Sequence, residues 1–186
     1  MNLFKLPKKS LGQNFLIDKN IINKIVEIGN IEKSRTVLEI GPGYGSLTKE
    51  IVNNNPKKLI AVEKDKKLAS LIKKSFKNLK NINVINDDIF NVIKNVNFDK
   101  KIIVFCNLPY NISTQILASL IMLEKWPPWY ETLVLMFQKE VADRILAKKG
   151  SKEYGRLSIL CNWRLNVKKH FNVSKNCFFP KPKINS

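Results

Sequence analysis

The chain has 186 residues, 44% of them hydrophobic, so it is long enough to bury a core and short enough to expect one domain. Lysine and arginine number 33 against 15 acidic residues, a formal net charge of +18 that indicates a polyanionic partner. The composition excludes a disulfide-stapled secreted fold, and no apolar run is long enough to cross a membrane.

The cysteines and the N-terminal segment predict a cytoplasmic protein without membrane association. Cys106, Cys161 and Cys177 are widely spaced and form no metal-ligand pairs, so we expect no metal site. Residues 1–17 form a basic N-terminal segment with no apolar stretch behind its lysines, so no secretory signal is expected.

From residue 18 onward the apolar pattern predicts alternating helices and strands. Asp18 can cap a helix whose apolar residues recur at helical spacing up to Ile28, with Gly29 as its stop. Strands are then predicted at residues 36–40, 59–62, 82–85, 102–106 and 133–137. Helices are predicted at residues 46–53, 68–76, 112–123 and 138–148. This alternation predicts an α/β fold with a mainly parallel, doubly wound sheet.

The first strand-to-helix turn, residues 41–45, reads Gly-Pro-Gly-Tyr-Gly, and its glycines let the backbone approach a ligand closely. A dinucleotide fingerprint would place glycine or alanine at position 46, where this chain has Ser46, so nicotinamide or flavin binding is disfavoured. The alternating glycines, Gly41 and Gly43 among them, instead suit a nucleoside cofactor without a pyrophosphate. The alternative is a turn that only joins a strand to a helix.

Acidic residues follow the next two predicted strands. Glu63 stands where an acidic residue of such folds accepts hydrogen bonds from both ribose hydroxyls. Asp88 could accept a hydrogen bond from the amino group of an adenine, with Asp87 beside it as an equally acidic alternative. A charged residue after a strand is often only solvated, but the register of Glu63 with the glycine turn favours binding.

Asn107, Leu108, Pro109 and Tyr110 follow the strand predicted at 102–106 and suit a planar base that carries an amino group. The side-chain carbonyl of Asn107 and the backbone carbonyl of Leu108 can accept hydrogen bonds from the two N–H groups of that amine. Pro109 stiffens the turn without adding a donor, and Tyr110 offers a face for stacking, worth roughly 1–3 kcal/mol per base. The alternative is a turn that merely ends a strand.

A series of segments, in order along the chain, resembles the ribosomal RNA adenine dimethyltransferases, in particular the bacterial small-subunit type, the kasugamycin-sensitivity methyltransferase family. The segments are residues 11–16, 39–48, 61–65, 107–113, 138–142, 154–158 and 178–186. The resemblance implies a Rossmann-like class I methyltransferase domain over residues 1–186, with S-adenosylmethionine as the cofactor. It places cofactor contacts on Asn14 and Leu16, which the residues alone would assign to ordinary packing. The further contacts that it implies are Gly41, Glu63, Asp88 and Asn107.

By the same resemblance, the reaction is methyl transfer to adenine N6, performed twice on each of two adjacent adenosines near the 3′ end of small-subunit ribosomal RNA. The protein would supply position and desolvation rather than a strong base, so the only histidine, His170, is expected to have no chemical role. Phe178 is expected to clamp the base together with Tyr110, with Phe179 as the alternative. We expect a monomer whose partners are the small-subunit RNA and the pre-assembled small ribosomal subunit.

The target base must leave its stack to react, and exposed cations are expected to hold the surrounding RNA through its phosphates. Part of the lysine excess could reflect genome composition, but the sign of the net charge would survive that discount. The candidate cations are Lys5, Lys8, Lys9, Lys148, Lys149, Lys152, Arg156, Lys168 and Lys169.

Departures from the family pattern leave alternatives open. Lys181 and Asn185 replace a proline and an aspartate of the terminal motif, and family members continue past this motif into a small helical domain that we expect to be absent here. One rival is the large-subunit adenine methyltransferase of macrolide resistance, although Gly12 and Leu108 favour the small-subunit enzyme. Another is an RNA-binding ribosome assembly factor, against which the intact Asn107, with its Pro and Tyr neighbours, argues.

Overall fold

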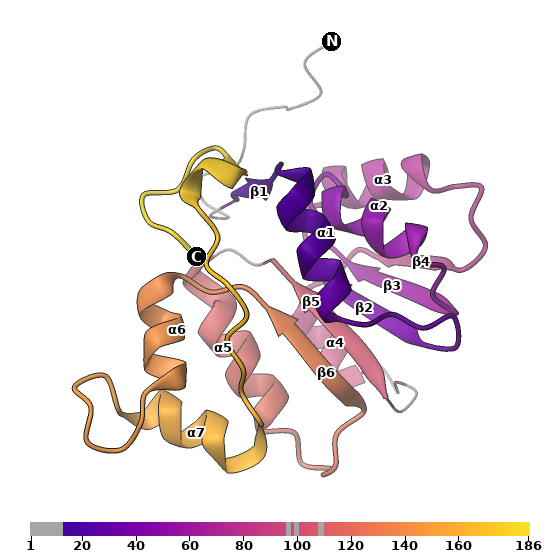
Figure 1. Ribbon diagram of the computed structural model, residues 1–186. Coiled ribbons are helices and arrows are strands. Elements are labelled where there is room, and N and C mark those ends of the chain that lie inside the picture. Colours follow the sequence, from indigo (N-terminus) through magenta and orange to yellow (C-terminus); the bar gives the residue numbers. More distant parts are fainter. Residues whose placement is uncertain (1–12, 96–97, 99–100, 108–109) are drawn as a thin grey trace.

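Five parallel strands form the central sheet of the computed structural model, which describes residues 13–95, 98, 101–107 and 110–186 (Figure 1). The strands are β2 (Thr36–Ile40), β3 (Lys58–Val62), β4 (Ile82–Ile85), β5 (Ile102–Cys106) and β6 (Tyr130–Leu135). They lie in the order β4-β3-β2-β5-β6, with every neighbouring pair parallel. The predicted α/β fold with a doubly wound parallel sheet is confirmed, and the strand order reverses direction between β2 and β5.

Helices cover both faces of this sheet (Figure 1). On one face, α1 (Lys19–Ile28) and α2 (Ser46–Asn53) bury Val26 and Ile51 against β2 and β5. On the other face, α4 (Ile89–Asn95) and α5 (Tyr110–Ile121) bury Val92 and Leu120. The remaining helices are α3 (Lys66–Ser75), α6 (Lys139–Leu146) and α7 (Arg156–Arg164), the last two packed on α5.

The start of α1 is capped as the sequence predicts. Asp18 Oδ1 accepts hydrogen bonds from the backbone N–H groups of Asn20, at 2.9 Å, and of Ile21, at 3.1 Å. These bonds satisfy donors that have no partner within the helix, and the helix ends at Gly29.

Strand β6 differs from its prediction at 133–137. It begins earlier, because Tyr130 pairs with Ile102 and its hydroxyl donates to the Leu120 carbonyl at 3.1 Å. The register shifts between Ile102 and Ile103, and the strand ends at Leu135. The apolar run alone could not predict this start, because it depends on the hydrogen bond from Tyr130 to the neighbouring helix α5.

Five further elements were not predicted: α4, α7, the short 3-10 helix η2 (Lys175–Cys177) and the two-residue strands β1 (Phe15–Leu16) and β7 (Phe178–Phe179). β1 and β7 pair antiparallel, with Leu16 opposite Phe178, and the Ile17 N–H donates to the Cys177 carbonyl at 2.9 Å. Residues at opposite ends of the chain thus lie side by side, next to the start of α1 (Figure 1).

A large cavity follows the outer edge of β6. It measures about 550 Å³ and lies between β6 and residues 165–173, with Asn107 and Ser186 in its lining. Ser186 and Val173 exchange backbone hydrogen bonds, and the Lys139 N–H donates to the Asn185 carbonyl at 3.1 Å. These bonds hold residues 185–186 beside this cavity.

Within the described ranges, no helix is both long enough and apolar enough to cross a bilayer. No group of three His, Cys, Asp or Glu residues in that same part of the chain is placed to hold a metal ion. The three cysteines are free thiols.

Candidate cofactor and base site

A cavity of about 260 Å³ opens at the carboxyl ends of the strands, beside the point where the strand order reverses. The residues predicted to bind the cofactor all line it: Asn14, Leu16, Gly41, Gly43, Glu63, Asp88 and Asn107. These residues come from the turn after β2, the ends of β3 and β5, the segment after β4 and the β1 region. The structure thus brings together residues that are up to 93 positions apart in the sequence, from Asn14 to Asn107.

The glycine turn follows β2 in a conformation that favours glycine. Gly41, Gly43 and Gly45 have φ angles of 71°, 59° and 84°. The Gly43 N–H donates to Glu63 Oε2 at 3.1 Å, which ties the turn to the end of β3. A Cβ on Gly43 would lie 2.8 Å from the Phe15 ring, so β1 and its aromatic ring close directly over this turn.

Replacing Gly43 by alanine is therefore expected to cost about 1–3 kcal/mol of folding free energy and to weaken cofactor binding. Both the positive φ and the contact with Phe15 oppose the added methyl group. The matched control is Gly150→Ala, because Gly150 also has a positive φ, 93°, but its added Cβ meets no atom within 4 Å. Urea unfolding and calorimetric binding of S-adenosylmethionine should show a larger stability loss at position 43 and an affinity loss only there. Equal losses in the two variants would mean that Phe15 yields freely.

Glu63 is a buried carboxylate, 7% exposed, at the end of β3. Its Oε1 accepts the Asp65 N–H at 2.9 Å, and its Oε2 accepts the Gly43 N–H. Burial raises the pKa of Glu63, while these two backbone N–H groups act against that rise. Each oxygen keeps a lone pair for a further donor, so the carboxylate can accept hydrogen bonds from a pair of ribose hydroxyls.

Asp87 and Asp88 both line the cavity, but their own contacts differ. Asp88 Oδ2 accepts from Lys64 Nζ at 2.8 Å, and Oδ1 accepts the Phe90 N–H at 3.0 Å. The Lys64 hydrogen bond lowers the pKa of Asp88, which keeps it an ionised acceptor. Asp87 Oδ1 is occupied by the Asp88 N–H and by Asn91 Nδ2. The two aspartates remain the alternatives for an adenine amino group.

Asn107 stands at the end of β5 and lines both the 260 Å³ cavity and the 550 Å³ cavity along β6. Among the residues of the predicted base-holding turn, Asn107 is therefore the one that the described part of the structure places at the cofactor cavity. Leu108 and Pro109 lie outside the described residues. Tyr110 begins α5, and its side chain is outside the described part as well.

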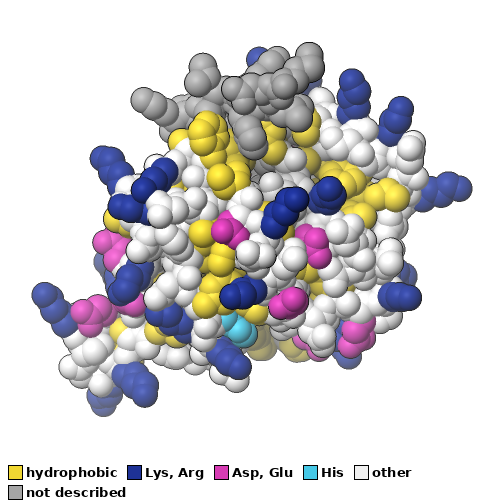
Figure 2. Space-filling view, turned by 45° about the horizontal axis from the view of Figure 1, so that its top comes forward, with side chains coloured by type: hydrophobic (Ala, Val, Ile, Leu, Met, Phe, Trp, Pro, Cys, Tyr) yellow, Lys and Arg dark blue, Asp and Glu magenta, His cyan; other side chains and the backbone are white. Residues whose placement is uncertain are grey.

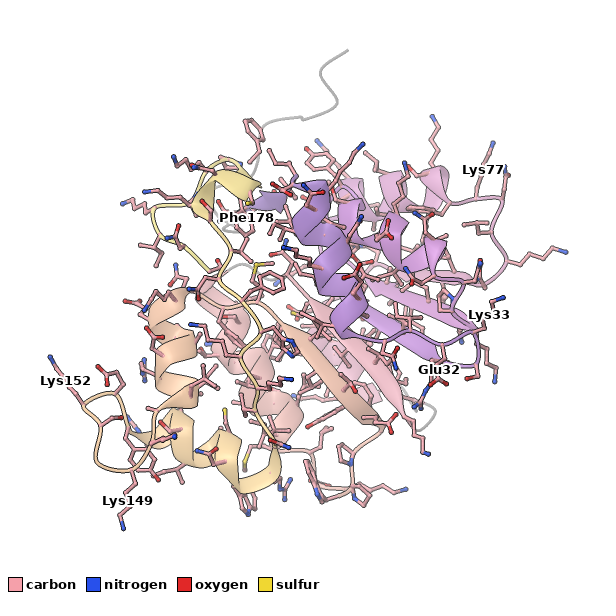
Figure 3. The ribbon with its side chains drawn as sticks, viewed as in Figure 1. Glu32, Lys33, Lys77, Lys149, Lys152 and Phe178 are labelled. Carbon is pink, nitrogen blue, oxygen red and sulfur yellow. The ribbon has the colours of Figure 1, made fainter. Side chains whose placement is uncertain are left out.

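Phe178 is not among the residues that line the cofactor cavity. It is 3% exposed and packs in the core cluster that contains Leu16 and Val173, beside β1 (Figure 3). Phe179, the alternative, is 45% exposed. The predicted clamp thus stays a prediction, with its two candidates in very different surroundings.

Sequence reasoning overlooked Glu39, which also lines the cavity although it is only 2% exposed. Burial raises the pKa of Glu39 to about 8, helped by the nearby Glu63, while Thr48 acts in the opposite direction. Its signal was present in the sequence, because Glu39 is the one charged residue within an otherwise buried strand.

The cations predicted to contact phosphates are exposed where the structure describes them: Lys148, Lys149, Lys152, Arg156, Lys168 and Lys169. Lys149 and Lys152 project from the loop between α6 and α7, away from the end of the molecule where Phe178 lies (Figure 3). Lys and Arg side chains also stand around the outline of the face shown in Figure 2. Lys5, Lys8, Lys9 and Gly12 lie outside the described residues.

Known proteins share this arrangement over nearly the whole chain. Residues 5–186 match the family described as ribosomal RNA adenine dimethylase. The ribosomal RNA small subunit methyltransferase A of Pelagibacter ubique is 52% identical over 184 residues, which cover 99% of this chain and 69% of the relative. Its counterpart from Wolbachia pipientis wMel is 42% identical, over 97% of this chain and 62% of the relative.

Solved structures agree in fold. A dimethyladenosine transferase from Plasmodium falciparum superposes with a TM-score of 0.79 at 35% identity, covering 92% of this chain and 60% of that protein. The 23S rRNA methyltransferase ErmE gives a TM-score of 0.75 at 28% identity, covering 92% of this chain and 66% of that protein. This chain thus spans about two thirds of the length of these proteins.

The family match predicts a Rossmann-like class I methyltransferase, and three features agree with it. These are the strand order, the glycine turn tied to Glu63, and the position of Asn107 at the same cavity. The chain belongs to the ribosomal RNA adenine dimethylase family.

Proposed function

We propose that this chain transfers methyl groups from S-adenosylmethionine to N6 of two adjacent adenosines near the 3′ end of small-subunit ribosomal RNA. Class I methyltransferases of this family use S-adenosylmethionine as the methyl donor. The observation that carries the proposal is that Asn107 lines the same cavity as Glu63 and Asp88. Groups suited to holding a nucleoside and a group suited to holding an amine thus meet in one place.

The cavity fits this cofactor on structural grounds. Glu63 is a buried carboxylate with lone pairs left for ribose hydroxyls, and Asp88 is held by Lys64 as an acceptor for an adenine amine. The turn at Gly43 has no room for a side chain and offers no phosphate-binding glycine pattern, which suits a nucleoside without a pyrophosphate. When bound, the cofactor would supply an electrophilic methyl group.

For the base, we propose that Asn107 and the carbonyl of Leu108 accept hydrogen bonds from the two N–H groups of the adenine amine. Held in this way, the nitrogen lone pair can point towards the methyl group, so catalysis rests on position and exclusion of water. Pro109 would stiffen this turn and Tyr110 would stack on the ring, with Phe178 or Phe179 on its other side. The amine can lose its proton to water as the new bond forms.

The RNA partner follows from charge and from the relatives. A net charge of +18 suits binding to phosphates, and such binding weakens steeply with salt. The relatives at 52% and 42% identity are named as small-subunit methyltransferases, which favours the small-subunit RNA and the pre-assembled small ribosomal subunit as partners. We further propose that the protein acts as a monomer in the cytoplasm and that residues 1–186 form one catalytic domain.

A large-subunit substrate is the second candidate, because ErmE, named as a 23S rRNA methyltransferase, has the same fold at a TM-score of 0.75. The lower identity of ErmE, 28%, makes it the weaker one. An RNA-binding assembly factor without activity is the third, and it would have no need of Asn107 at the cofactor cavity.

The test is to incubate the protein with S-adenosylmethionine and unmethylated small ribosomal subunits, and in parallel with large subunits. Digestion of the RNA and mass spectrometry of its nucleosides should show N6,N6-dimethyladenosine only from the small subunits. Product from the large subunits alone would transfer the proposal to the second candidate. Cofactor binding without product from either subunit would favour the assembly factor.

A further inference from the structure

Exposed apolar side chains gather at the end of the molecule opposite the cofactor cavity. Of the nine large apolar residues that are exposed in the described part of the chain, five lie in α7, in the loop before it, or between α5 and β6. We call these five the tryptophan patch: Met122, Trp126, Tyr154, Ile159 and Trp163. In the ribbon, α7 and the start of β6 lie far from β1 and β7 (Figure 1). Such a concentration of apolar surface on a soluble protein indicates a binding surface.

The outward side of α7 is apolar although its inward side is already packed. Ser158 and Cys161 are buried, and the Ser158 hydroxyl donates to the Arg144 carbonyl at 2.6 Å, which ties α7 to α6. Ile159 and Trp163 are four positions apart, so they share the outward side of the helix, where they are 54% and 59% exposed. Packing of the protein core therefore does not account for these two residues.

Arg164 joins the two tryptophans of the patch into one fixed surface. Its guanidinium carbon lies 4.0 Å from the centre of the Trp163 ring and 4.7 Å from that of the Trp126 ring. Arg164 Nη1 also donates to the carbonyls of Ile121 and Leu123, at 2.8 and 2.9 Å, so the guanidinium is anchored at the end of α5. A cation held against ring faces restrains both rings. Much of each ring nevertheless stays open to a ligand, since Trp126 is 40% exposed and Trp163 is 59% exposed.

The surroundings of the tryptophan patch are strongly basic. Residues 148–169 contain seven lysines and arginines against one acidic residue, Glu153. In the neighbouring segment, Glu131 is already paired with Arg35 at 2.7 Å. This charge favours a polyanion over a protein as the partner, because lysine is depleted in protein interfaces. Exposed aromatic rings among cations are the arrangement that binds unpaired nucleic acid, with the bases on the rings and the phosphates on the cations.

We propose that the tryptophan patch is a second RNA-binding surface, which holds an unpaired RNA segment by stacking its bases on Trp126 and Trp163. Exposed cations such as Lys149 and Lys152, which project from the loop before α7, bind the phosphates of that segment (Figure 3). The segment is unpaired, because the bases of a duplex stack on one another and present no open face. The inference goes beyond the proposed function, since this surface binds RNA without the cofactor and without a target adenosine.

The experiment measures binding of a fluorescent oligouridine of about 12 nucleotides to the full chain by anisotropy, a length within the range that such surfaces cover. Oligouridine contains no adenine, so it offers no adenine amine to the proposed base site. Trp163→Leu stays apolar but loses the ring, and it should weaken binding about 5–30-fold, whereas Trp163→Phe should keep most of the affinity. Leu79→Ala, at an exposed position between α3 and β4, is the control and should bind like wild type.

Salt dependence separates stacking from charge. Trp163→Leu should lower the affinity by the same factor at every salt concentration. The double variant Lys149→Ala/Lys152→Ala should instead make the affinity less dependent on salt, because fewer phosphates are neutralised. A duplex RNA of the same length should bind to wild type and to Trp163→Leu equally well, since it has no open base for the ring.

Wild-type affinity of Trp163→Leu for oligouridine would overturn the inference and leave the patch to a protein partner. Equal losses of affinity for oligouridine and for the duplex would overturn it as well. If circular dichroism shows that Trp163→Leu does not fold, tryptophan fluorescence of the wild-type protein decides. Stacked bases should quench Trp126 and Trp163, so no quenching at saturating oligouridine would overturn the inference. Methyl transfer enters none of these measurements, which keeps failure of this inference distinct from failure of the proposed function.

Discussion

Asn107→Ala is expected to slow methyl transfer by about 100–1,000-fold, the size of effect seen when one group that orients or stabilises the reacting atoms is removed. Asn107 lines the cofactor cavity at the end of β5, and its side-chain carbonyl is one of the two acceptors that we propose for the adenine amine. Without it the amine can rotate, and its lone pair no longer points at the methyl group. Cofactor affinity should fall much less, because the proposed contacts of Glu63 and Asp88 with other parts of the ligand remain in place.

The measurement is single-turnover transfer of a radioactive methyl group to unmethylated small subunits, with cofactor binding followed separately by calorimetry. Asn162→Ala, at an exposed position in α7, is the control and should react like wild type. A variant at position 107 that kept its full rate would remove the amine-holding role from Asn107. It would also revive the assembly-factor alternative, in which this turn has no chemical task.

The strands, and the polar residues that follow them, could be predicted because each depends on local sequence. Continuous apolar runs predict buried parallel strands, and parallel strands bring their carboxyl ends to one edge of the sheet. The positions of Glu63 and Asp88 after two such runs were therefore enough to place both at one cavity, as the structure confirms. The Asp18 cap and the end of α1 at Gly29 are equally local, and both are confirmed.

What the sequence missed depends on contacts between distant residues. β1 and β7 have only two residues each, too few for a periodic pattern, and they exist because Leu16 pairs with Phe178 across the chain. Without this pairing, Asn14 could not be placed at the cavity from its neighbours. α7 has apolar residues on its outer side too, since Ile159 and Trp163 are 54% and 59% exposed, so it lacks the one-sided pattern of a surface helix.

Glu39→Gln is expected to make the ligand-free protein more resistant to alkaline pH. Burial raises the pKa of Glu39 from 4.5 to about 8, so between these values the folded protein keeps a proton that the unfolded chain has released. Raising the pH therefore favours unfolding, and the stability that this group contributes at low pH is lost as the pH rises. From pH 5 to pH 8 the loss amounts to about 3–4 kcal/mol, and glutamine, which cannot titrate, escapes it.

Urea unfolding of wild type and Glu39→Gln at pH 5, 6.5 and 8 would measure this difference without any ligand. At each higher pH the free energy of unfolding of Glu39→Gln should rise relative to that of the wild type. Glu27→Gln should have the same pH dependence as the wild type, because its side chain is exposed in the folded protein. A constant difference between wild type and Glu39→Gln would mean that Glu39 is already ionised in the folded chain. In that case a partner for its Oε2 must lie outside the described residues, and the cofactor would enter a cavity whose negative charge is already in place.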